Sequence, residues 1–384
     1  MFIFSQQHPD SRSSRPWEII KDAILENFLP VYIKSMLIRN KIPLLIDAYA
    51  GEGIYEDGSY GSPIIMLNTA YNIFKLTGKL TELNKVYFLF MEKEYDYFDS
   101  LQLNISNFMN SHQEIGNEQI ITFQGNSQEE LSKIADFIQQ EAPLLSPFLY
   151  LDPWGLRGVG SDLIINFLEL RNWGIEAEIL LRFPPGDVYR FYRNSRLGEE
   201  WIRKVLGDIE LQELDVDRGE RNIEILRRYV NVIRTKYQKS YGRDLYYVAV
   251  EVEGKPPYFM VFFSEHHYGC FVMGNSMING LRKYLEIYFP LLGAEALKPF
   301  EANEEIIMRF ITKYKGQRQS SEPITIAELF ANYNRESLFP VLFRQPRGTR
   351  LQTIQHVIMK LKQDGVIQNI QGRVSDEHSL VYLS

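Results

Sequence analysis

The segment from Leu44 to Pro63 (LLIDAYAGEGIYEDGSYGSP) constrains the fold more than any other part of the chain. An apolar run ends at Asp47, a loop with Gly51 and Gly53 follows, and the closing Ser-Pro pair is typical of a helix start. Because glycine has no Cβ, such a loop lets backbone N–H groups come close to a ligand. The spacing is not that of a dinucleotide fingerprint. The segment predicts a buried parallel strand followed by a binding loop, with a tight turn that binds nothing as the alternative.

Two further predicted strands are followed by polar residues that suit a nucleoside. The strand over 85–91 ends at Glu92, whose carboxylate is placed to accept hydrogen bonds from ribose hydroxyls. Alternatively, Glu92 begins the next helix, where a carboxylate interacts favourably with the helix dipole. The strand over 119–124 precedes Asn126, which stands in the right order to meet an adenine ring or to cap the next helix.

A fourth predicted strand, over 147–151, ends in Asp152-Pro153-Trp154-Gly155. The Asp152 carboxylate and the Pro153 carbonyl can both accept hydrogen bonds from an amino group, and the Trp154 ring can stack on a base. Because parallel strands end at one edge of a sheet, these residues are expected beside the glycine loop. The alternative is a strand-to-loop turn that carries a packed tryptophan.

A helix is predicted before the first strand, and a fifth strand follows the fourth. Residues 17–39 have apolar side chains at helical spacing, and Pro30 is expected to kink or divide this helix. The fifth strand is predicted for 178–182.

Residues after the fifth strand complete the first domain. The segment 186–243 has the pattern of a helical insertion rich in both signs of charge, and two strands, 245–252 and 258–263, follow as a hairpin. We therefore expect an α/β domain over residues 1–300, with five βα units and an antiparallel hairpin.

Residues 301–384 are predicted to form a winged-helix domain, with three helices before a terminal hairpin. The exposed face of the third helix carries hydrogen-bond donors that suit phosphates and base edges: Arg350, Gln352, Gln355, His356 and Lys360. From Arg309 onward the chain has 11 Lys and Arg against 6 Asp and Glu, whereas the preceding part has a net charge of −12. This asymmetry favours DNA or RNA as a partner, with a protein–protein module as the alternative.

The composition indicates the cellular compartment of the protein. Cys270 is the single cysteine, so the chain can form neither an intrachain disulfide nor a thiolate zinc cluster, which fits a reducing cytoplasm. The net charge of −7 argues against a uniformly basic nucleic-acid binder. No apolar run is long enough to cross a bilayer, and the first residues lack the apolar content of a signal peptide. We expect a cytoplasmic protein without membrane contact or structural metal.

The chain resembles the three-Cys-motif partner proteins (TcmP family), in which a methyltransferase-like domain precedes a winged helix. The resemblance covers nearly the whole chain, and its marks are Lys21, Leu25, Leu29 and Pro30, the loop 46–53, Gly61-Ser62-Pro63, the segments 151–155 and 259–269, and the C-terminal module. It implies a Rossmann-like class I S-adenosylmethionine-dependent methyltransferase sheet. It also implies a partner protein that carries a three-cysteine motif, which this chain lacks.

The resemblance to class I methyltransferases assigns roles to the residues described above. S-adenosylmethionine would be the cofactor, and its expected contacts are Asp47, Tyr49, Ala50, Gly51, Gly53, Glu92, Asn126 and Asp152. Asp47 would accept from the ammonium group of the cofactor and Glu92 from its ribose. The catalytic residues would be Asp152, Pro153 and Trp154, which would orient the methyl acceptor.

Three positions depart from the family patterns. Tyr49 and Glu52 replace Phe and Pro of the usual F-A-G-P-G loop, and Glu52 places a negative charge near a positive sulfonium. The D-P-P-Y of amino-methylating enzymes is here D-P-W-G, so Gly155 stands where a stacking ring is expected. The main hypothesis is a methyltransferase acting on nucleic acid with a partner protein. The alternatives are an inactive nucleic-acid-binding partner or regulator, and methyl transfer to a protein or small molecule.

Overall fold

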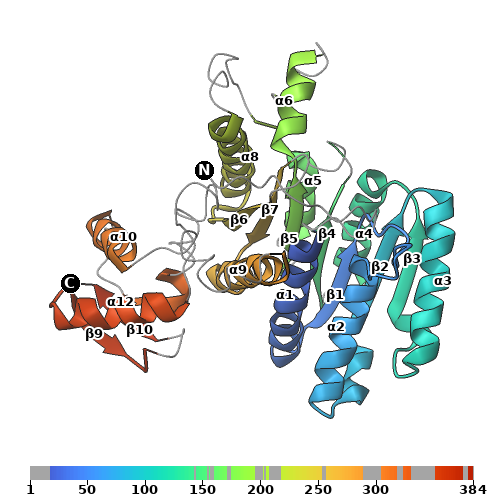
Figure 1. Cartoon of the computed structure of the whole chain (residues 1–384), viewed down its shortest axis with the longest axis horizontal. Coiled ribbons are helices and arrows are strands. Elements are labelled where there is room, and N and C mark those ends of the chain that lie inside the picture. Colours follow the sequence, from blue (N-terminus) through green and yellow to red (C-terminus); the bar gives the residue numbers. More distant parts are fainter. Residues whose placement is uncertain are drawn as a thin grey trace.

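The structure is a computed structural model that describes residues 18–141, 144–153, 155, 160–170, 174–194, 202, 205–206, 218–252, 257–288, 304–317, 323–329, 351–374 and 379–383. Within these residues, seven strands form one sheet in the order β3-β2-β1-β4-β5-β7-β6 (Figure 1). The strands are β1 (Ile42–Asp47), β2 (Tyr87–Glu92), β3 (Ile120–Gln124), β4 (Leu145–Leu151), β5 (Glu178–Phe183), β6 (Tyr246–Val252) and β7 (Tyr258–Ser264).

The direction of the strands confirms the predicted sheet. β1 pairs in parallel with β2 and β4, β2 with β3, and β4 with β5. β7 runs antiparallel to both β5 and β6, so the last two strands form the expected hairpin at one side of the sheet. The carboxyl ends of β1, β2 and β4 therefore lie at the same edge, where Asp47, Glu92 and Asp152 are found.

Helices cover both faces of this sheet. The first face is covered by α1 (Glu18–Ile38), α2 (Ser62–Leu76), α3 (Tyr95–Ser111) and α9 (His267–Tyr288). The second face is covered by α4 (Ser127–Glu141), α5 (Ser161–Leu168), α6 (Pro185–Asn194) and α8 (Arg218–Tyr241). Short 3-10 turns, η1 (Leu80–Lys85) and η2 (Asn117–Gln119), precede β2 and β3. α6 and α8 lie in the range predicted for the helical insertion.

Alternate residues of the central strands supply the two cores. In β4, Phe148 and Tyr150 pack on the first face, whereas Leu149 and Leu151 pack on the second. All four side chains are at most 1% exposed. A strand buried on both faces needs apolar residues at every position, which explains why the strands appear in the sequence as continuous apolar runs.

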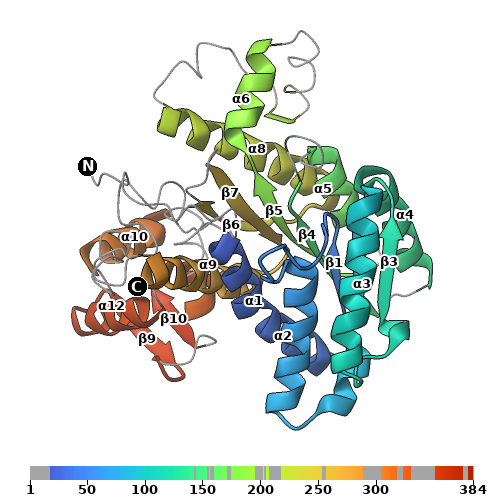
Figure 2. The same ribbon diagram turned by 45° about the vertical axis from the view of Figure 1, so that its right-hand side comes forward.

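α1 packs against α9, which follows it by more than two hundred residues in the chain (Figure 2). Gly280 allows the close approach, because a Cβ there would lie 2.8 Å from the carbonyl oxygen of Ile20. Lys283 of α9 pairs with Glu26 of α1 at 2.7 Å. α1 continues through Pro30, so of the two predicted outcomes, a kink or a division, the structure excludes the division. Packing against the sheet and α9 stabilises the helix although Pro30 cannot donate an intrahelical hydrogen bond.

The C-terminal elements lie beside α9 in both views (Figures 1 and 2). They are α10 (Glu304–Gln317), β8 (Ile324–Thr325), α12 (Leu351–Gln363), β9 (Ile367–Gln371) and β10 (Leu380–Leu383). The predicted hairpin of β9 and β10 is present, and β8 pairs with β10 to give the sheet order β8-β10-β9. Ile324 and Thr325 form β8, and the helical residues 326–329 follow directly. The winged-helix assignment stays a prediction.

Among the described residues, no helix combines the length and apolar character that crossing a bilayer requires.

Candidate functional site

Asp47 ends β1 with a fully buried carboxylate. Its Oδ1 accepts a hydrogen bond from the Tyr49 N–H at 3.1 Å, while its Oδ2 is buried and accepts none from any described residue. Burial raises the pKa of Asp47 from 3.8 to about 7, partly offset by the Ser62 hydroxyl and the Tyr49 N–H. The nearby charges of Asp152 and Glu92 raise this pKa further. The three carboxylates predicted to share one edge of the sheet therefore lie close enough to interact.

The loop after Asp47 is held by backbone hydrogen bonds. The Ala50 N–H donates to the Met91 carbonyl of β2 at 2.8 Å. Gly51 has φ +60° and Gly53 has φ +79°, a region that residues with a Cβ rarely adopt. A Cβ on Gly51 would meet no atom within 4 Å, so the backbone there faces open space. Open space at this position is compatible with the approach of a ligand that the sequence predicts, and that approach stays a prediction.

The rest of the loop is a small hairpin. Ile54 and Tyr60 form an antiparallel bridge, and the Tyr55 N–H donates to the Ser59 carbonyl at 2.9 Å. The Gly61 N–H donates to the Gly53 carbonyl at 2.7 Å, which closes the loop just before α2 begins.

Glu92 at the end of β2 fixes the glycine loop from the neighbouring strand. Its Oε2 accepts from the Gly51 N–H at 2.8 Å, and its Oε1 accepts from the N–H groups of Lys93 and Glu94, each at 2.8 Å. Each carboxylate oxygen can accept about two hydrogen bonds, so Oε2 keeps capacity for one further donor. Both interpretations of Glu92 are thus compatible with the structure. Its Oε1 accepts from the backbone N–H groups that precede α3, and its Oε2 can still accept a hydrogen bond from a ribose hydroxyl.

The residues after β3 serve the start of α4. The Asn126 carbonyl accepts from the N–H groups of Glu129 and Glu130 at 3.0 and 3.1 Å, and the Asn126 side chain donates to the Glu129 carboxylate at 3.0 Å. The Ser127 hydroxyl donates to the Ala48 carbonyl, which ties α4 to the end of β1. Burial raises the pKa of the half-buried Tyr49 phenol to about 12.

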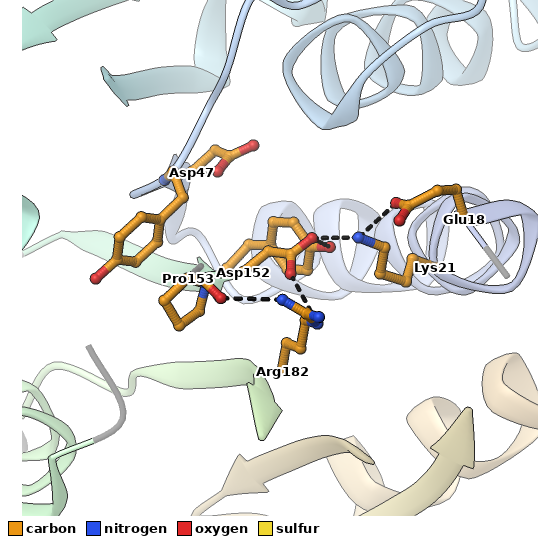
Figure 3. A network of polar contacts seen from close by, with 8 residues as sticks. Glu18, Lys21, Asp47, Asp152, Pro153 and Arg182 are labelled. Carbon is orange, nitrogen blue, oxygen red and sulfur yellow. Dashed lines mark hydrogen bonds and ion pairs between the residues drawn. The ribbon is translucent and has the colours of Figure 1, made fainter. Parts of the chain in front are cut away.

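Asp152, after β4, is the centre of an ionic network (Figure 3). Its Oδ2 pairs with the Lys21 ammonium of α1 and accepts from the Tyr150 hydroxyl at 3.3 Å. Lys21 also pairs with Glu18 at 2.5 Å. Burial alone would lower the pKa of Lys21, but Asp152 and Glu18 hold it well above the usual value. Lys21 is therefore a buried cation next to the expected acceptor site.

Arg182 of β5 completes this network. Its Nη1 donates to the Pro153 carbonyl at 3.0 Å, and its Nε lies 3.6 Å from Asp152 Oδ1 (Figure 3). The Arg182 guanidinium also lies over the Tyr258 ring, 4.6 Å from its centroid. The two acceptors predicted to receive a substrate amino group therefore already bond to cations of the protein itself.

Sequence reasoning missed Arg182 and gave Lys21 no role at the site. Arg182 is the last residue of the predicted fifth strand, and nothing local indicates that it reaches Pro153. Lys21 was noted only as part of a family pattern. Lys21 lies on the buried face of α1, between apolar residues at helical spacing. This position could have indicated an ion pair, because a buried lysine needs a buried partner.

The remaining predicted site residues are only partly placed. Trp154 and Arg350 lie outside the described residues. Gln352 lies in α12, but its side chain is not described. His356 and Lys360 are exposed on α12 and Gln355 is partly exposed, which is compatible with a surface for binding. In the described part of the chain, no group of three or more His, Cys, Asp or Glu side chains could hold a metal ion.

Comparisons with known proteins give structural similarity only. No protein-family model matches the chain, and no curated protein matches it. The chain is similar to protein LPL1258 from Legionella pneumophila, with a TM-score of 0.40 and 9% identity over 73% of this chain and 95% of that chain. It is also similar to the methyltransferase domain of bacterial CtHen1-C, with a TM-score of 0.31 and 12% identity over 64% of this chain and 98% of that one.

A third similar structure is the plantazolicin methyltransferase BamL in complex with a triazolic desmethylPZN analog and SAH. Its TM-score is 0.33, with 11% identity over 71% of this chain and 79% of that chain. Similarities of this size assign no activity, so the function is argued from the residues of the site.

Proposed function

We propose that this protein is an S-adenosylmethionine-dependent methyltransferase, with the cofactor at the carboxyl ends of β1, β2 and β4. The observation that carries the proposal is the Asp47 carboxylate: Oδ2 is buried and accepts no hydrogen bond from the described residues, and it lies next to a glycine loop whose backbone faces open space. A buried carboxylate oxygen without a donor is costly, and an ammonium group would supply the missing hydrogen bond. The Asp47 carboxylate is thus a suitable acceptor for the ammonium group of an amino-acid ligand.

Each residue around the loop has a part in binding. Asp47 Oδ2 would accept from the ammonium group, and the backbone at Gly51 would lie against the methionine portion. The remaining acceptor capacity of Glu92 Oε2 would receive a ribose hydroxyl, while its bond to the Gly51 N–H keeps the loop in place. When bound, the cofactor would supply a methyl group on a sulfonium, and the neutral thioether that remains after transfer is a good leaving group. The contribution of the protein is positioning, with little acid–base chemistry.

Isothermal titration calorimetry with S-adenosylmethionine tests the proposal. The wild-type protein should bind, and Asp47→Asn should weaken binding at least tenfold, since the amide presents one acceptor and no charge. Glu114→Gln, on an exposed carboxylate between α3 and η2, is a matched control that should leave binding unchanged. Absence of binding at millimolar cofactor by the folded wild-type protein would remove the proposal.

Nucleic acid is the proposed class of substrate. The support is the positive charge balance of the C-terminal segment and the exposed donors of α12, in a module that we interpret as a winged helix. The resemblance to the three-Cys-motif partner proteins adds a second protein with a three-cysteine motif as the proposed partner. A survey of tritiated-methyl incorporation into DNA, RNA and protein fractions, with and without that partner, identifies the acceptor.

A second candidate function is a methyltransferase fold retained as a nucleic-acid-binding partner or regulator. The observation that favours it is the bonding of Asp152 and Pro153 to Lys21 and Arg182, which leaves less acceptor capacity for a substrate amine. It predicts salt-sensitive binding of DNA or RNA without methyl incorporation. Incorporation that Asp47→Asn abolishes would exclude this second candidate.

A further inference from the structure

A cavity lies at the opposite end of the large sheet from the candidate site. Its volume is about 550 Å³, and its lining comes from α1, the start of α9 and the amino ends of β4 and β5. Ser146, near the start of β4, lines it, whereas Asp152 follows the other end of that strand. Six residues of extended strand, about 20 Å, separate the two positions. The cavity is therefore distinct from the proposed cofactor site.

Apolar side chains form one wall of the cavity. α1 contributes Phe28, Val31 and Met36, and α9 contributes Val272 and the ring of Tyr268. Small-molecule sites typically have volumes of roughly 300–1,000 Å³ and apolar walls with a few placed polar groups. The cavity matches that description in both volume and lining.

Glu178, the first residue of β5, is a polar group of the lining that lacks a full set of hydrogen-bond partners among the described residues. Its Oε1 accepts from the Ser264 hydroxyl at 3.1 Å, while its Oε2 is buried and accepts no hydrogen bond from any residue in the described part of the chain. Gly269 lets α9 start this close to the strand, because a Cβ there would collide with Glu178 Oε1 and the Ser264 hydroxyl. The local packing thus holds the carboxylate in place without supplying its second donor.

The neighbouring carboxylate, Glu176, has a different environment. Arg39 pairs with it at 2.6 Å and the His266 Nε2 lies 3.4 Å from it. The hydrogen bond from His266 is the main reason that the pKa of Glu176 falls to about 2. Burial instead raises the pKa of Glu178 to about 7. Arg39 and His266 therefore pair directly with Glu176, whereas no described residue donates a hydrogen bond to Glu178 Oε2.

We propose that this cavity binds a small organic amine or amidine. Its N–H group donates to Glu178 Oε2, and its apolar part packs against the wall formed by α1 and α9. An anionic ligand would bring a like charge to a buried carboxylate. A purely apolar ligand would leave the buried Oε2 without a donor, which is costly as well. Lys34 also lines the cavity, but it is exposed, so solvent screens its charge.

Calorimetric titration of the full-length protein at pH 8 tests this inference with three probes that share a phenyl ring. 2-Phenylethylamine and benzamidine carry the required donor, and 3-phenylpropionate replaces the amine with a carboxylate. The two cationic probes should bind and the anion should bind at least tenfold more weakly. Equal binding of the amine and the carboxylate, or no binding of either cation at millimolar concentration, would overturn the inference.

Two variants locate the binding. Glu178→Gln is nearly isosteric and should weaken amine binding at least tenfold, and Val272→Phe should do the same by filling the cavity. Glu286→Gln, on an exposed part of α9 outside the cavity, is the matched control and should bind as the wild-type protein does. Amine binding that Glu178→Gln leaves unchanged contradicts the inference. Asp47→Asn should not affect amine binding, so failure of the cofactor proposal and failure of this one are separate results.

Discussion

Asp47 and Asp152 end neighbouring strands, yet their carboxylates have opposite environments. Asp47 is fully buried with one oxygen that no described residue bonds, whereas Asp152 contacts Lys21, Arg182 and the Tyr150 hydroxyl. The first arrangement suits a carboxylate that accepts a hydrogen bond from a bound ligand. The second suits a carboxylate that holds protein elements together, because it joins α1, β4 and β5. Two aspartates at the ends of neighbouring strands thus have different roles: Asp47 is placed to bind a ligand, and Asp152 connects elements of the fold.

The first prediction concerns the cost of keeping Asp47 buried. Its pKa is about 7 in the folded protein against 3.8 ordinarily, so folding favours the protonated form. Stability from this group is fully present below about pH 4 and is lost as the pH rises to about 7. We expect Asp47→Asn to increase the free energy of unfolding at pH 8 by roughly 1–3 kcal/mol while it weakens cofactor binding.

Urea unfolding at pH 5 and pH 8 measures this effect. The gain should be small at pH 5 and larger at pH 8. A variant less stable than the wild-type protein at both values would show that the Asp47 carboxylate stabilises the unliganded fold.

A second prediction concerns Glu178, which burial keeps partly protonated near neutral pH. The Ser264 hydroxyl, His266 and Arg39 lower its pKa and Glu176 raises it, with a net value of about 7 against 4.5 ordinarily. The pH dependence therefore has the same sign as that of Asp47: the stability that this group contributes is lost as the pH rises from about 4.5 to 7. Glu178→Gln should reduce the loss of stability between pH 5 and pH 8 by about 1–3 kcal/mol.

Thermal or urea unfolding of Glu178→Gln and Glu286→Gln in parallel checks this. The exposed Glu286 should leave the pH profile unchanged. Identical profiles for both variants and the wild-type protein would mean that Glu178 titrates as an ordinary carboxyl.

At the scale of elements, the sequence predicted what depends on local pattern. The continuous apolar runs identified the buried strands, and the order of strands and helices predicted a parallel sheet with a terminal hairpin. The small residues after Asp47 predicted the loop that follows β1, whereas the positive φ of Gly51 and Gly53 was found only in the structure. Contacts between distant segments could not be predicted. The pairing of Arg182 with Pro153 and the pairing of β8 with β10 depend on how whole elements pack, which one sequence does not reveal.

The third prediction tests the glycine loop with two substitutions that share one backbone strain. Gly51 and Gly58 both have positive φ, and a Cβ at either position meets nothing within 4 Å. Alanine at each should destabilise by a similar amount, about 1 kcal/mol. Of these two glycines, Gly51 is the one whose N–H donates to the Glu92 carboxylate, so Gly51→Ala should weaken S-adenosylmethionine binding at least tenfold and Gly58→Ala should not.

Calorimetry and urea unfolding of the two variants separate the effects. Equal affinity for the cofactor in both variants would show that the open backbone at Gly51 does not face the cofactor.

At the scale of the whole molecule, charge is distributed unevenly. The segment from Arg309 onward is positive, whereas the part that contains the large sheet is strongly negative. A negative surface repels phosphates, so a nucleic acid would approach the C-terminal segment first. Exposed donors on α12 lie in that segment.

The fourth prediction follows from this asymmetry. Lys360→Ala on α12 should weaken binding of a duplex oligonucleotide and reduce the slope of log affinity against log salt concentration by about one. Lys313→Ala, an equally exposed lysine on α10, is the matched control and should change the slope less. Fluorescence anisotropy at several salt concentrations measures both. Equal slopes for both variants would exclude α12 as the binding face.

The packing of α1 on α9 has a consequence for biosynthesis. α1 carries Lys21, which pairs with Asp152, but its main helical neighbour is made only after all seven strands of the large sheet. A nascent chain therefore has its glycine loop long before its first helix can dock at Gly280. The contacts between α1 and α9 can therefore form only in the last third of translation, after Lys21, Asp152 and Arg182 have all been made.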